Sequence, residues 1–536
     1  MTEPLGNHAV LGDLHTIALV GDDGALDWLC LPRFDSPACF AALTGDAGAG
    51  TWLAGPAAGG RATRRRYRPG TLVLESEWDT PDGTVRLVDC MPPRDGAARV
   101  VRVLEGVRGR TPVRVLFEPR FDHGQRGPWT RCTGRTVTAV AGADALRLDA
   151  DVPFEPVGTD GAVEARFSLA EGQRARFVLT HTPSHLTTPA AFDADAAIVA
   201  AERFWGDWSA RTGTAHDDVV RRALITLKAL TYAPTGAVVT TPVFTRGAER
   251  HLCDPLEAPA ILTALLGAGL VDEARAWRGW LLRAAAGDPG DVAARYSVDG
   301  QADRSAADGR AGLASVLYCL NATDALWAAP RDPAWDLQLG LLDHLAATWD
   351  RPGDDNVHAK VMAWAAFDRA VRTAERHDLP GPADHWRTLR SRIRADVCAK
   401  GFAPERNTFV RDYGSDAVDP ALLVLPAIGF LPWRDVRVRG TVAAIAATLS
   451  DDTGLVPGTP LSDGFRLVSA LHGTGYPVAA TALFDELLAV RNDVGLFGAR
   501  YDPGSTHAGP VPDTAATTGV LTARPPSTSD HSRHGP

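Results

Sequence analysis

The chain has very little lysine and no excess of positive charge. Among its 536 residues only Lys228, Lys360 and Lys400 are lysines, and 65 acidic residues outnumber 55 basic ones to give a net charge of -10. A surface of this sign disfavours nucleic acid and anionic membranes as partners. We therefore expect a small-molecule substrate or ligand, with no nucleic acid and no membrane.

The seven cysteines are widely spaced, and no CxxC pair occurs among them. Such a distribution disfavours a disulfide framework or a zinc site and favours reduced, mostly buried thiols. The sequence also has no run of 18 uncharged apolar residues, and it does not begin with a basic segment followed by an apolar run. We therefore expect a cytoplasmic protein without a membrane span.

Cofactor motifs are missing too. No phosphate loop or dinucleotide glycine pattern opens a helix after a strand, and histidines such as His377 and His385 lack partners at metal-ligand spacing. The sequence predicts neither a cofactor nor a bound metal.

Two kinds of pattern are present, and 536 residues exceed what one hydrophobic core usually supports. From about residue 7 to residue 183, short apolar or alternating runs are separated by Asp-Gly turns, which is typical of an antiparallel β-sandwich. We place this β-sandwich domain at residues 1–188 and an Ala-rich helical linker at 189–213.

Further along, the apolar period becomes helical, as Val220, Leu224 and Leu227 show. Many such segments, joined by loops with Gly and Pro, predict an all-α domain at 214–522, and the polar residues 523–536 predict a disordered tail. The expected helical segments are 217–233, 261–285, 311–329, 335–349, 359–377, 385–401, 419–430, 439–449 and 477–492.

One helical segment is apolar on almost every face. From residue 359 to residue 370 only three residues are charged, and such a helix belongs inside a large core. The preceding loop, WDRPGDDN, should then open onto the interior. A proton donor there could reach a bound ligand, although Asp is also favoured in turns and at helix starts. The titratable side chains at this mouth are Asp350, Asp354, Asp355 and His358.

Segments spread over most of the chain carry a family resemblance. They include LGDLHTIALVGDDGALDWLCLPRFDSPACF, RRRYRPGTLVLE, EPRFDHGQRGPW, AKVMAWAAFDRA and SDAVDPALLVLPAIGFLP. By these segments the chain resembles glycoside hydrolase family 15, of the bacterial glucoamylase and trehalase type. The resemblance implies an N-terminal β-sandwich ahead of an (α/α)6 barrel, a toroid of six helical hairpins.

The resemblance also implies a catalytic pair. Family members hydrolyse α-glucosidic bonds with inversion, using a carboxylic acid and a carboxylate base about 6.5 to 9.5 Å apart. The family acid is the Glu of a Trp-Glu pair shortly before a Ser-Lys-Val-Met helix, but here that helix begins with Ala359 and no Glu lies in the loop. Either Trp349-Asp350 is the shifted counterpart, or WDRPGDD matches the family's preceding Trp-x-x-Pro-Asp turn and the segment with the acid is deleted.

The position of the family base is changed as well. The pattern Gly-Leu-x-x-Glu-Glu-Tyr-Asp aligns with GLFGARYD, which puts Ala499 where the catalytic Glu belongs and Arg500 beside it. Asp502 is kept, but its family counterpart is not the base. A methyl group cannot take a proton, so the resemblance implies that the usual base is missing.

Positions that hold the sugar in the family differ in the same direction. The segment RHLCDPLEA has Leu256 and Glu257 where the family has the Arg and Asp that clamp the terminal glucose. Thr459 and Asp513 lie in two further altered segments, and Leu471 stands in place of a family aromatic near the start of a late helix. Each glucose hydroxyl left unpaired would cost about 1 to 3 kcal/mol, so a less polar ligand should fit better.

These substitutions favour a repurposed catalyst acting on a mainly apolar biosynthetic intermediate by acid-assisted cyclisation, isomerisation or dehydration. One carboxylic acid whose pKa is raised by an apolar cavity could suffice. Glu257 is the first candidate because it occupies a family pocket position among apolar neighbours, although it could equally complement a helix dipole. The candidate acids are Glu257, Asp254, Asp350, Asp355 and His358. The candidate substrate-binding residues are Leu256, Trp349, Thr459, Leu471, Ala499 and Asp513.

Two other hypotheses stay open. The fold could belong to a non-catalytic ligand-binding protein that has lost its chemistry. Alternatively, a residual α-glucoside hydrolase of the glucoamylase or trehalase type could use displaced acids such as Asp350 and Asp502. Release of glucose from maltooligosaccharides or trehalose would distinguish the hydrolase from the other two.

Overall fold

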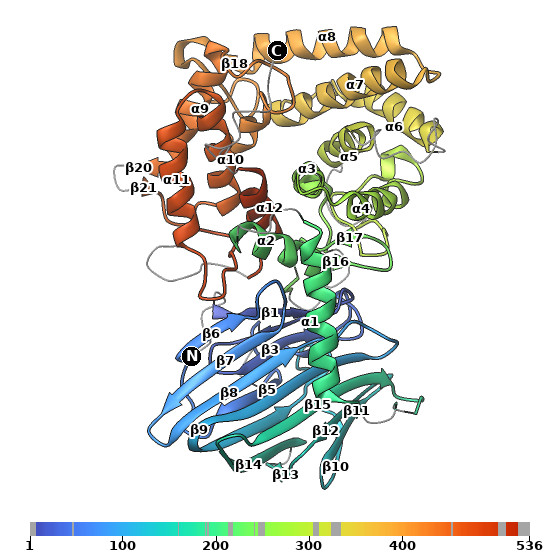
Figure 1. Ribbon diagram of the computed structural model, residues 1–536. Coiled ribbons are helices and arrows are strands. Elements are labelled where there is room, and N and C mark those ends of the chain that lie inside the picture. Colours follow the sequence, from blue (N-terminus) through green and yellow to red (C-terminus); the bar gives the residue numbers. More distant parts are fainter. Residues whose placement is uncertain are drawn as a thin grey trace.

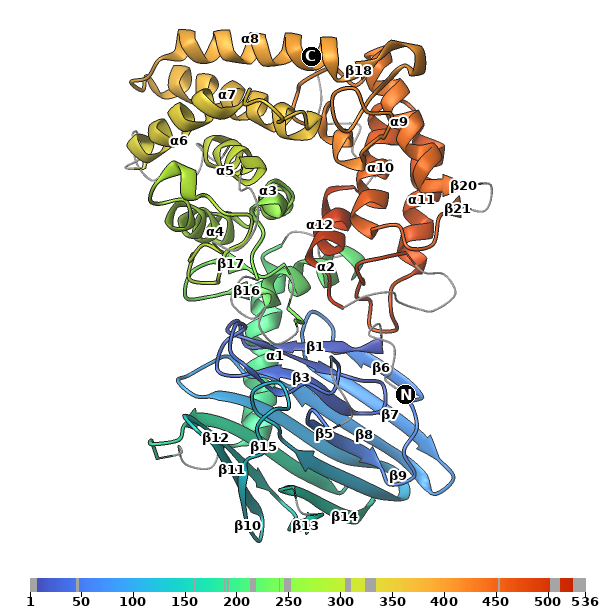
Figure 2. The same ribbon diagram turned by 180° about the vertical axis from the view of Figure 1, so that it is seen from behind.

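The molecule has an N-terminal sheet domain and a C-terminal helical domain, seen one below the other in Figures 1 and 2. Helix α1 (Ala194–Ala210) runs along the sheets towards the helical domain. This two-part arrangement confirms the predicted order of a strand-rich part before a helical part. The computed structural model describes residues 7–44, 48–158, 160–187, 189, 192–212, 218–240, 242–244, 252–303, 310–322, 334–451, 454–501 and 511–523.

The described strand pairings of the sheet domain are antiparallel, as predicted. The long strand β9 connects two groups of strands: its first part pairs with β8 and β15, and its second part with β5 and β14. The strands are β1 (Ala9–Gly12), β2 (Ile17–Val20), β3 (Ala25–Cys30), β4 (Ala38–Phe40), β5 (Thr51–Pro56), β6 (Arg64–Tyr67), β7 (Leu74–Thr80), β8 (Gly83–Cys90), β9 (Ala98–Glu118), β10 (Trp129–Thr133), β11 (Thr136–Ala141), β12 (Asp144–Ala150), β13 (Glu155–Val157), β14 (Ala162–Ala170) and β15 (Arg174–Pro183).

The alternating runs place one face of each strand in a core. In β11 the residues Val137, Ala139 and Ala141 are buried while their neighbours are half-buried, because successive side chains of a strand point to opposite faces. On another face, Ile198 and other small apolar residues of α1 pack against a cluster that includes Val101 of β9. The linker helix is therefore part of the sheet domain's packing rather than a free connection.

In the helical domain, contacts between helices follow the chain and return to their start. Helix α3 contacts α5, α5 contacts α7, α7 contacts the 3-10 helix η6, η6 contacts α10, and α10 contacts α12, which contacts α3. Helices α4, α6, α8, α9 and α11 each pack on a member of this series. The elements are α2 (Asp218–Ala229), η2 (Pro255–Glu257), α3 (Ala258–Gly267), α4 (Val271–Ala284), η3 (Pro289–Asp291), α5 (Arg310–Ala322), α6 (Trp335–Thr348), α7 (Val357–His377), α8 (Ala383–Lys400), η5 (Pro404–Arg406), η6 (Pro420–Val424), α9 (Val436–Leu449), α10 (Leu461–Gly473), α11 (Pro477–Ala489) and α12 (Thr514–Thr522). Short hairpins join some of them, namely β16 (Thr231–Tyr232) with β17 (Ala237–Val238), β18 (Phe402–Ala403) with β19 (Thr408–Phe409), and β20 (Ser450–Asp451) with β21 (Gly454–Leu455).

Helix α7 confirms the prediction of a core helix, since most of its side chains are buried, including that of Lys360. The expected helix at 419–430 was wrong. Only the 3-10 helix η6 forms there, because Pro426 has no amide hydrogen to donate and disfavours a helical conformation before it. The expected helix at 261–285 is divided into α3 and α4 at Gly269, whose φ of +73° ends a helix readily.

Polar contacts join the two domains. The buried guanidinium of Arg65 pairs with Asp493 at 2.6 Å, and the Asn492 side chain donates to the backbone oxygen of His8 at 3.0 Å. All seven cysteines are free thiols and five of them are buried. Within the described ranges, no helix is long and apolar enough to cross a membrane. Residues 524–536 of the predicted tail lie outside the described residues.

Candidate active site

Glu257 lies where the 3-10 helix η2 passes into α3. Its Oε2 atom is buried and has no hydrogen-bond partner among the described residues, and its side chain is 19% exposed. The pKa of Glu257 is raised to about 6, mainly by burial; Arg466 opposes this shift, and the carboxylates of Asp254, Asp513 and Asp463 contribute to it. Glu257 stands at the N-terminus of α3, where its charge can complement the helix dipole, but its side chain makes no capping hydrogen bond there.

Two further predicted residues, Asp254 and Asp513, lie near Glu257 and cap helices. Asp254 accepts a hydrogen bond from Leu256 N at 2.8 Å at the start of η2, and Asp513 accepts one from Ala516 N at 2.7 Å at the start of α12. Burial raises the pKa of both, that of Asp513 to about 6. They therefore position the backbone and also crowd negative charge around Glu257.

Asp463 and Arg466, in the first turns of α10, complete the group. Arg466 Nη1 lies 2.9 Å from Asp463 Oδ1, and its Nη2 lies 3.9 Å from Glu257 Oε1. One guanidinium thus stands between two carboxyl groups from distant parts of the chain. We call Asp254, Glu257, Asp463, Arg466 and Asp513 the inner carboxyl cluster.

His358, in the first turn of α7, lies within electrostatic range of the cluster. Its pKa is lowered by burial and by Arg466, against the opposing effect of Asp419. Asp419 caps η6 by accepting from Ala421 N at 2.9 Å, and its charge also raises the pKa of Asp463. The starts of η2, η6, α7, α10 and α12 therefore converge on one region of the helical domain.

Burial decides the protonation of this cluster. A helix start stabilises a carboxylate by about 0.3 to 1 kcal/mol at an exposed site, and both Arg466 and the capping hydrogen bonds act in the same direction. Even so, the pKa values of Glu257, Asp254, Asp463 and Asp513 all rise, with burial as the largest cause. Glu257 and Asp513, whose pKa values are raised to about 6, can therefore hold a proton at a higher pH than an ordinary carboxyl, as a general acid must.

The acidic loop before α7 lies elsewhere. Trp349, Asp350 and Asp355 line a cavity of about 530 Å³ together with Lys360, Arg392 and Lys400 of α7 and α8. The Asp350 side chain is 53% exposed and lies 3.6 Å from the Arg392 guanidinium. Asp354 lines the same cavity. The structure therefore does not bring these aspartates together with His358, and cations face them where the inner cluster has an excess of carboxyls.

Of the remaining predicted positions, some lie near the inner carboxyl cluster and others do not. Leu461 N, which opens α10, donates to Ala499 O at 3.0 Å, and Thr459 precedes that helix by two residues, so both lie beside the inner carboxyl cluster. Leu256 is 42% exposed next to Glu257. Leu471 lies in the last turn of α10, two turns beyond Asp463, so its assignment to the start of a helix was wrong.

The sequence interpretation missed Asp463, Arg466 and Asp419. In the sequence these residues are marked only by their position at or near the beginning of an apolar segment, in SDGFRL and VDPALL. Residues that merely cap a helix occur at the same kind of position, so this pattern does not distinguish a site residue. Within the described part of the chain, no group of three His, Cys, Asp or Glu side chains is arranged to hold a metal ion. The carboxyl groups of the inner carboxyl cluster can supply proton transfer and hydrogen bonding.

Comparisons with known proteins agree with the order of the two domains. Residues 1–170 match the family described as "Trehalase-like, N-terminal", and residues 299–493 match "Glycosyl hydrolases family 15". A trehalase of Mycolicibacterium smegmatis is 26% identical, with 97% of this chain and 90% of that protein covered. A trehalase of Thermoplasma volcanium is 25% identical, with 86% of this chain and 81% of that protein covered.

The fold is glucoamylase-like. A bacterial glucoamylase complexed with acarbose superposes with a TM-score of 0.74 at 12% identity, covering 97% of this chain and 93% of that one. The match extends over both domains, so their arrangement, and not only each fold, is shared. The matched segment 299–493 contains Asp463 and Arg466 of the inner carboxyl cluster.

Proposed function

We propose, because residues 299–493 match glycosyl hydrolase family 15 and residues 1–170 match the trehalase-like N-terminal family, that this chain hydrolyses a small α-glucoside of the trehalose type. The trehalases that resemble it cover nearly the whole chain. The observation that carries the proposal is the buried carboxyl of Glu257, which has an oxygen without a hydrogen-bond partner among the described residues and a pKa of about 6.

Glu257 serves as the general acid. Cleavage of a glycosidic bond needs a proton on the leaving oxygen, and a carboxyl with a raised pKa carries that proton at a pH where ordinary carboxyls have lost it. The partnerless Oε2 has unused hydrogen-bonding capacity, so an incoming glycosidic oxygen need not break an existing bond. This role replaces the displaced acids Asp350 and Asp502 of the sequence analysis, of which Asp350 lines another cavity and Asp502 lies outside the described residues.

Asp463 serves as the base. Burial raises the pKa of Asp463, and its contact with Arg466 at 2.9 Å opposes that shift by favouring the carboxylate form that a base needs. Helix α10 begins against Ala499, the position that holds the base in the family resemblance. A single guanidinium separates the Asp463 and Glu257 carboxyls, which is compatible with the spacing of about 6.5 to 9.5 Å used by inverting glycosidases. A water held by Asp463 would then attack the anomeric carbon from the face opposite the leaving group.

The returning series of contacts between helices supports the finer fold assignment. We infer that α12, α3, α5, α7, η6 and α10 correspond to the inner layer of an (α/α)6 barrel, with α4, α6, α8, α9 and α11 outside. In this arrangement the element starts that carry the inner carboxyl cluster lie at one end of the barrel. The shortness of η6 is the departure from a regular toroid.

The test is glucose release from trehalose and from maltose by the purified full chain, measured between pH 4 and pH 8. We expect Glu257→Gln to lower kcat by about 10² to 10⁴ and Asp463→Asn to lower it comparably. Glu375→Gln, at a half-exposed position on α7, is the matched control and should leave the rate unchanged. Loss of activity in Asp350→Asn, with activity retained in Glu257→Gln, would show that the acid lies in the other cavity.

Ala499 favours a second candidate function. If the base position without a carboxylate is not replaced by Asp463, the inner carboxyl cluster can still protonate an apolar substrate, as in the repurposed catalyst of the sequence analysis. The comparisons give this biosynthetic role no support. Absence of glucose release from any α-glucoside, together with loss of another acid-catalysed conversion in Glu257→Gln, would select it.

A further inference from the structure

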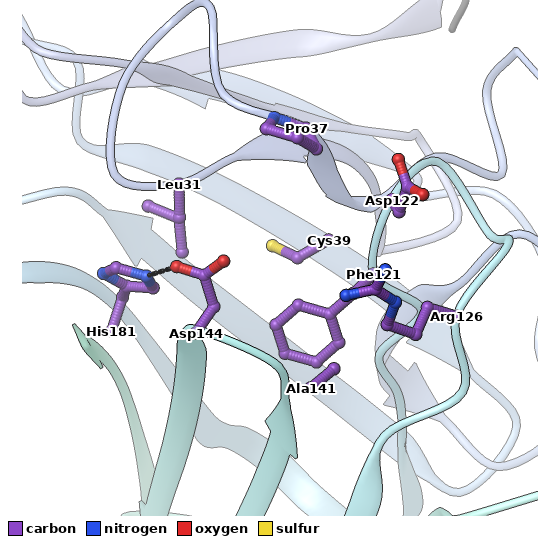
Figure 3. A pocket seen from close by; sticks show the side chains of 9 residues that line it. All are labelled: Leu31, Pro37, Cys39, Phe121, Asp122, Arg126, Ala141, Asp144 and His181. Carbon is purple, nitrogen blue, oxygen red and sulfur yellow. Dashed lines mark hydrogen bonds and ion pairs between the residues drawn. The ribbon is translucent and has the colours of Figure 1, made fainter. Parts of the chain in front are cut away.

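A second cavity lies in the sheet domain. Its volume is about 230 Å³, and it opens where the ends of β4, β11, β12 and β15 meet the turn that follows β9 (Figure 3). In that view His181 and Asp144 lie on one side, Asp122 and Arg126 on the other, and Leu31 and Phe121 also border the space. The lining includes no member of the inner carboxyl cluster.

One side of the cavity is built around a buried histidine. His181, on β15, is 5% exposed, and its Nε2 lies 2.9 Å from Oδ1 of Asp144, whose side chain is 42% exposed. Strand pairing places His181 opposite Leu146 of β12, so both side chains of the pair stand on neighbouring, paired strands. This side is therefore rigid and presents a carboxylate to solvent.

The other side is a tightly held turn. Phe121 and Arg126 exchange backbone hydrogen bonds of 2.9 and 3.0 Å, while Asp122 and His123 both have a φ of +53°. Gly124 follows with φ +87°, and a Cβ there would come within 2.9 Å of Ala49. The turn holds the Asp122 carboxyl and the Arg126 guanidinium at the cavity in an uncommon backbone conformation.

The polar groups have mixed character. Two carboxylates accept hydrogen bonds and one guanidinium donates them, so an anion such as phosphate would meet Asp122 and Asp144, and a cation would meet Arg126. A neutral molecule with several hydroxyls can donate to the carboxylates and accept from Arg126 at once. The Phe121 ring and Leu31 add an apolar surface, against which the C–H face of a sugar ring can pack.

The size of the cavity and the state of the Cys39 thiol narrow the range of ligands that could bind there. Pockets that enclose drug-sized ligands measure roughly 300 to 1,000 Å³, so a cavity of about 230 Å³ suits a single ring. Cys39 also lines it, but its Sγ is buried and donates to Leu29 O at 3.3 Å, and burial raises the pKa of this thiol far above neutrality. The cavity is therefore suited to binding rather than to nucleophilic attack by Cys39.

We propose that this cavity is a second ligand site, in which a neutral monosaccharide ring binds the sheet domain between the His181–Asp144 pair and the Asp122–Arg126 turn. The ring packs on Phe121, and its hydroxyls bond to the two carboxylates and the guanidinium. The proposal is independent of hydrolysis at Glu257.

The test is amide hydrogen exchange of the full chain with D-glucose as the probe. We expect glucose to slow exchange in peptides covering 119–126 and 141–147, in the wild type and equally in Glu257→Gln. Arg126→Ala should raise the dissociation constant for glucose by at least about tenfold, because it removes a hydrogen bond to a charged group. Ala141→Leu, which narrows the cavity, should abolish the effect.

Arg131→Ala, an exposed arginine on the neighbouring strand β10, is the matched control and should bind glucose as the wild type does. If Ala141→Leu does not fold, the exposed Arg126→Ala variant still decides the outcome. Absence of protection by glucose in these peptides, or equal protection by inorganic phosphate or by cyclohexanol, overturns the proposal. If glucose protects these peptides but the wild type does not cleave trehalose, only the proposed hydrolysis is overturned.

Discussion

Replacing Glu257 by Gln should change how the stability of the protein depends on pH. The pKa of Glu257 rises from 4.5 to about 6 because burial penalises the charged carboxylate. At about 1.4 kcal/mol for each pKa unit, this difference is worth about 2 kcal/mol of folding free energy. Because the folded-state pKa is the higher one, this stability is fully present below about pH 4.5 and is lost as the pH rises through about 6.

A glutamine at this position does not ionise, so the variant lacks that loss. Between pH 4.5 and pH 7.5 the wild type should lose about 2 kcal/mol more stability than Glu257→Gln, whatever constant cost the amide adds at both values. Thermal unfolding of both proteins at the two pH values gives the stability that each one loses between pH 4.5 and pH 7.5. The prediction concerns the difference between these two losses. Glu375→Gln should follow the wild type, since its carboxylate is half-exposed.

The same substitution should remove catalysis. In the wild type, kcat/KM for trehalose should fall as the pH rises through about 6, because the acid must hold its proton. From pH 4.5 to pH 7.5 the Glu257→Gln variant should therefore lose less stability than the wild type. The same variant should be nearly inactive. An equal pH dependence of unfolding in the two proteins would refute the argument from burial, and full activity would refute the assignment of the acid.

Three further changes test other parts of the molecule. Ala499→Glu should increase glucose release from trehalose if this position faces the same water as Asp463, and an unchanged rate in a folded variant would show that it does not. Asp89→Asn breaks the fully buried pair with Arg102, whose Nε lies 2.9 Å from Asp89 Oδ1, and should lower the free energy of unfolding of the sheet domain by about 3 to 5 kcal/mol, as measured by denaturant unfolding. Lys360→Met keeps the buried stem but loses the hydrogen bond from Nζ to Trp349 O at 3.1 Å, and should cost about 1 to 3 kcal/mol in thermal unfolding without affecting catalysis by Glu257.

Much of the architecture follows from periodicity. Alternating runs such as that of β11, and the all-round apolar character of α7, are local properties that the sequence displays directly. The 3-10 helix η6 escaped this reasoning because residues 419–430 are apolar enough for a helix, while one proline within them decides the backbone. The apolar composition of a segment predicts that it is buried, but its backbone hydrogen bonds decide which secondary structure it forms.

The site was harder to predict than the fold. Glu257, Asp254 and Asp513 were reached through a family resemblance, but Asp463 and Arg466 were not, because their relation to Glu257 exists only after η2 and α10 are brought together. Leu471 shows the opposite error, since an alignment by residue type placed it in the pocket while the helix carries it to the far end of α10. The first case depends on packing between segments that are distant in the sequence, and the second on where α10 begins and ends.

The comparison of the two acidic groups shows why residue type alone is not sufficient. The loop before α7 and the inner carboxyl cluster are both rich in carboxylates, and by composition the loop has the stronger resemblance to an acid site. In the structure Lys360, Arg392 and Lys400 line the same cavity as the loop. The cluster instead has one guanidinium for four carboxyls, and burial raises the pKa of Glu257 and of Asp463. The raised pKa of Glu257 comes mainly from its burial among helices that are distant in the sequence, which the acidic composition of a segment does not reveal.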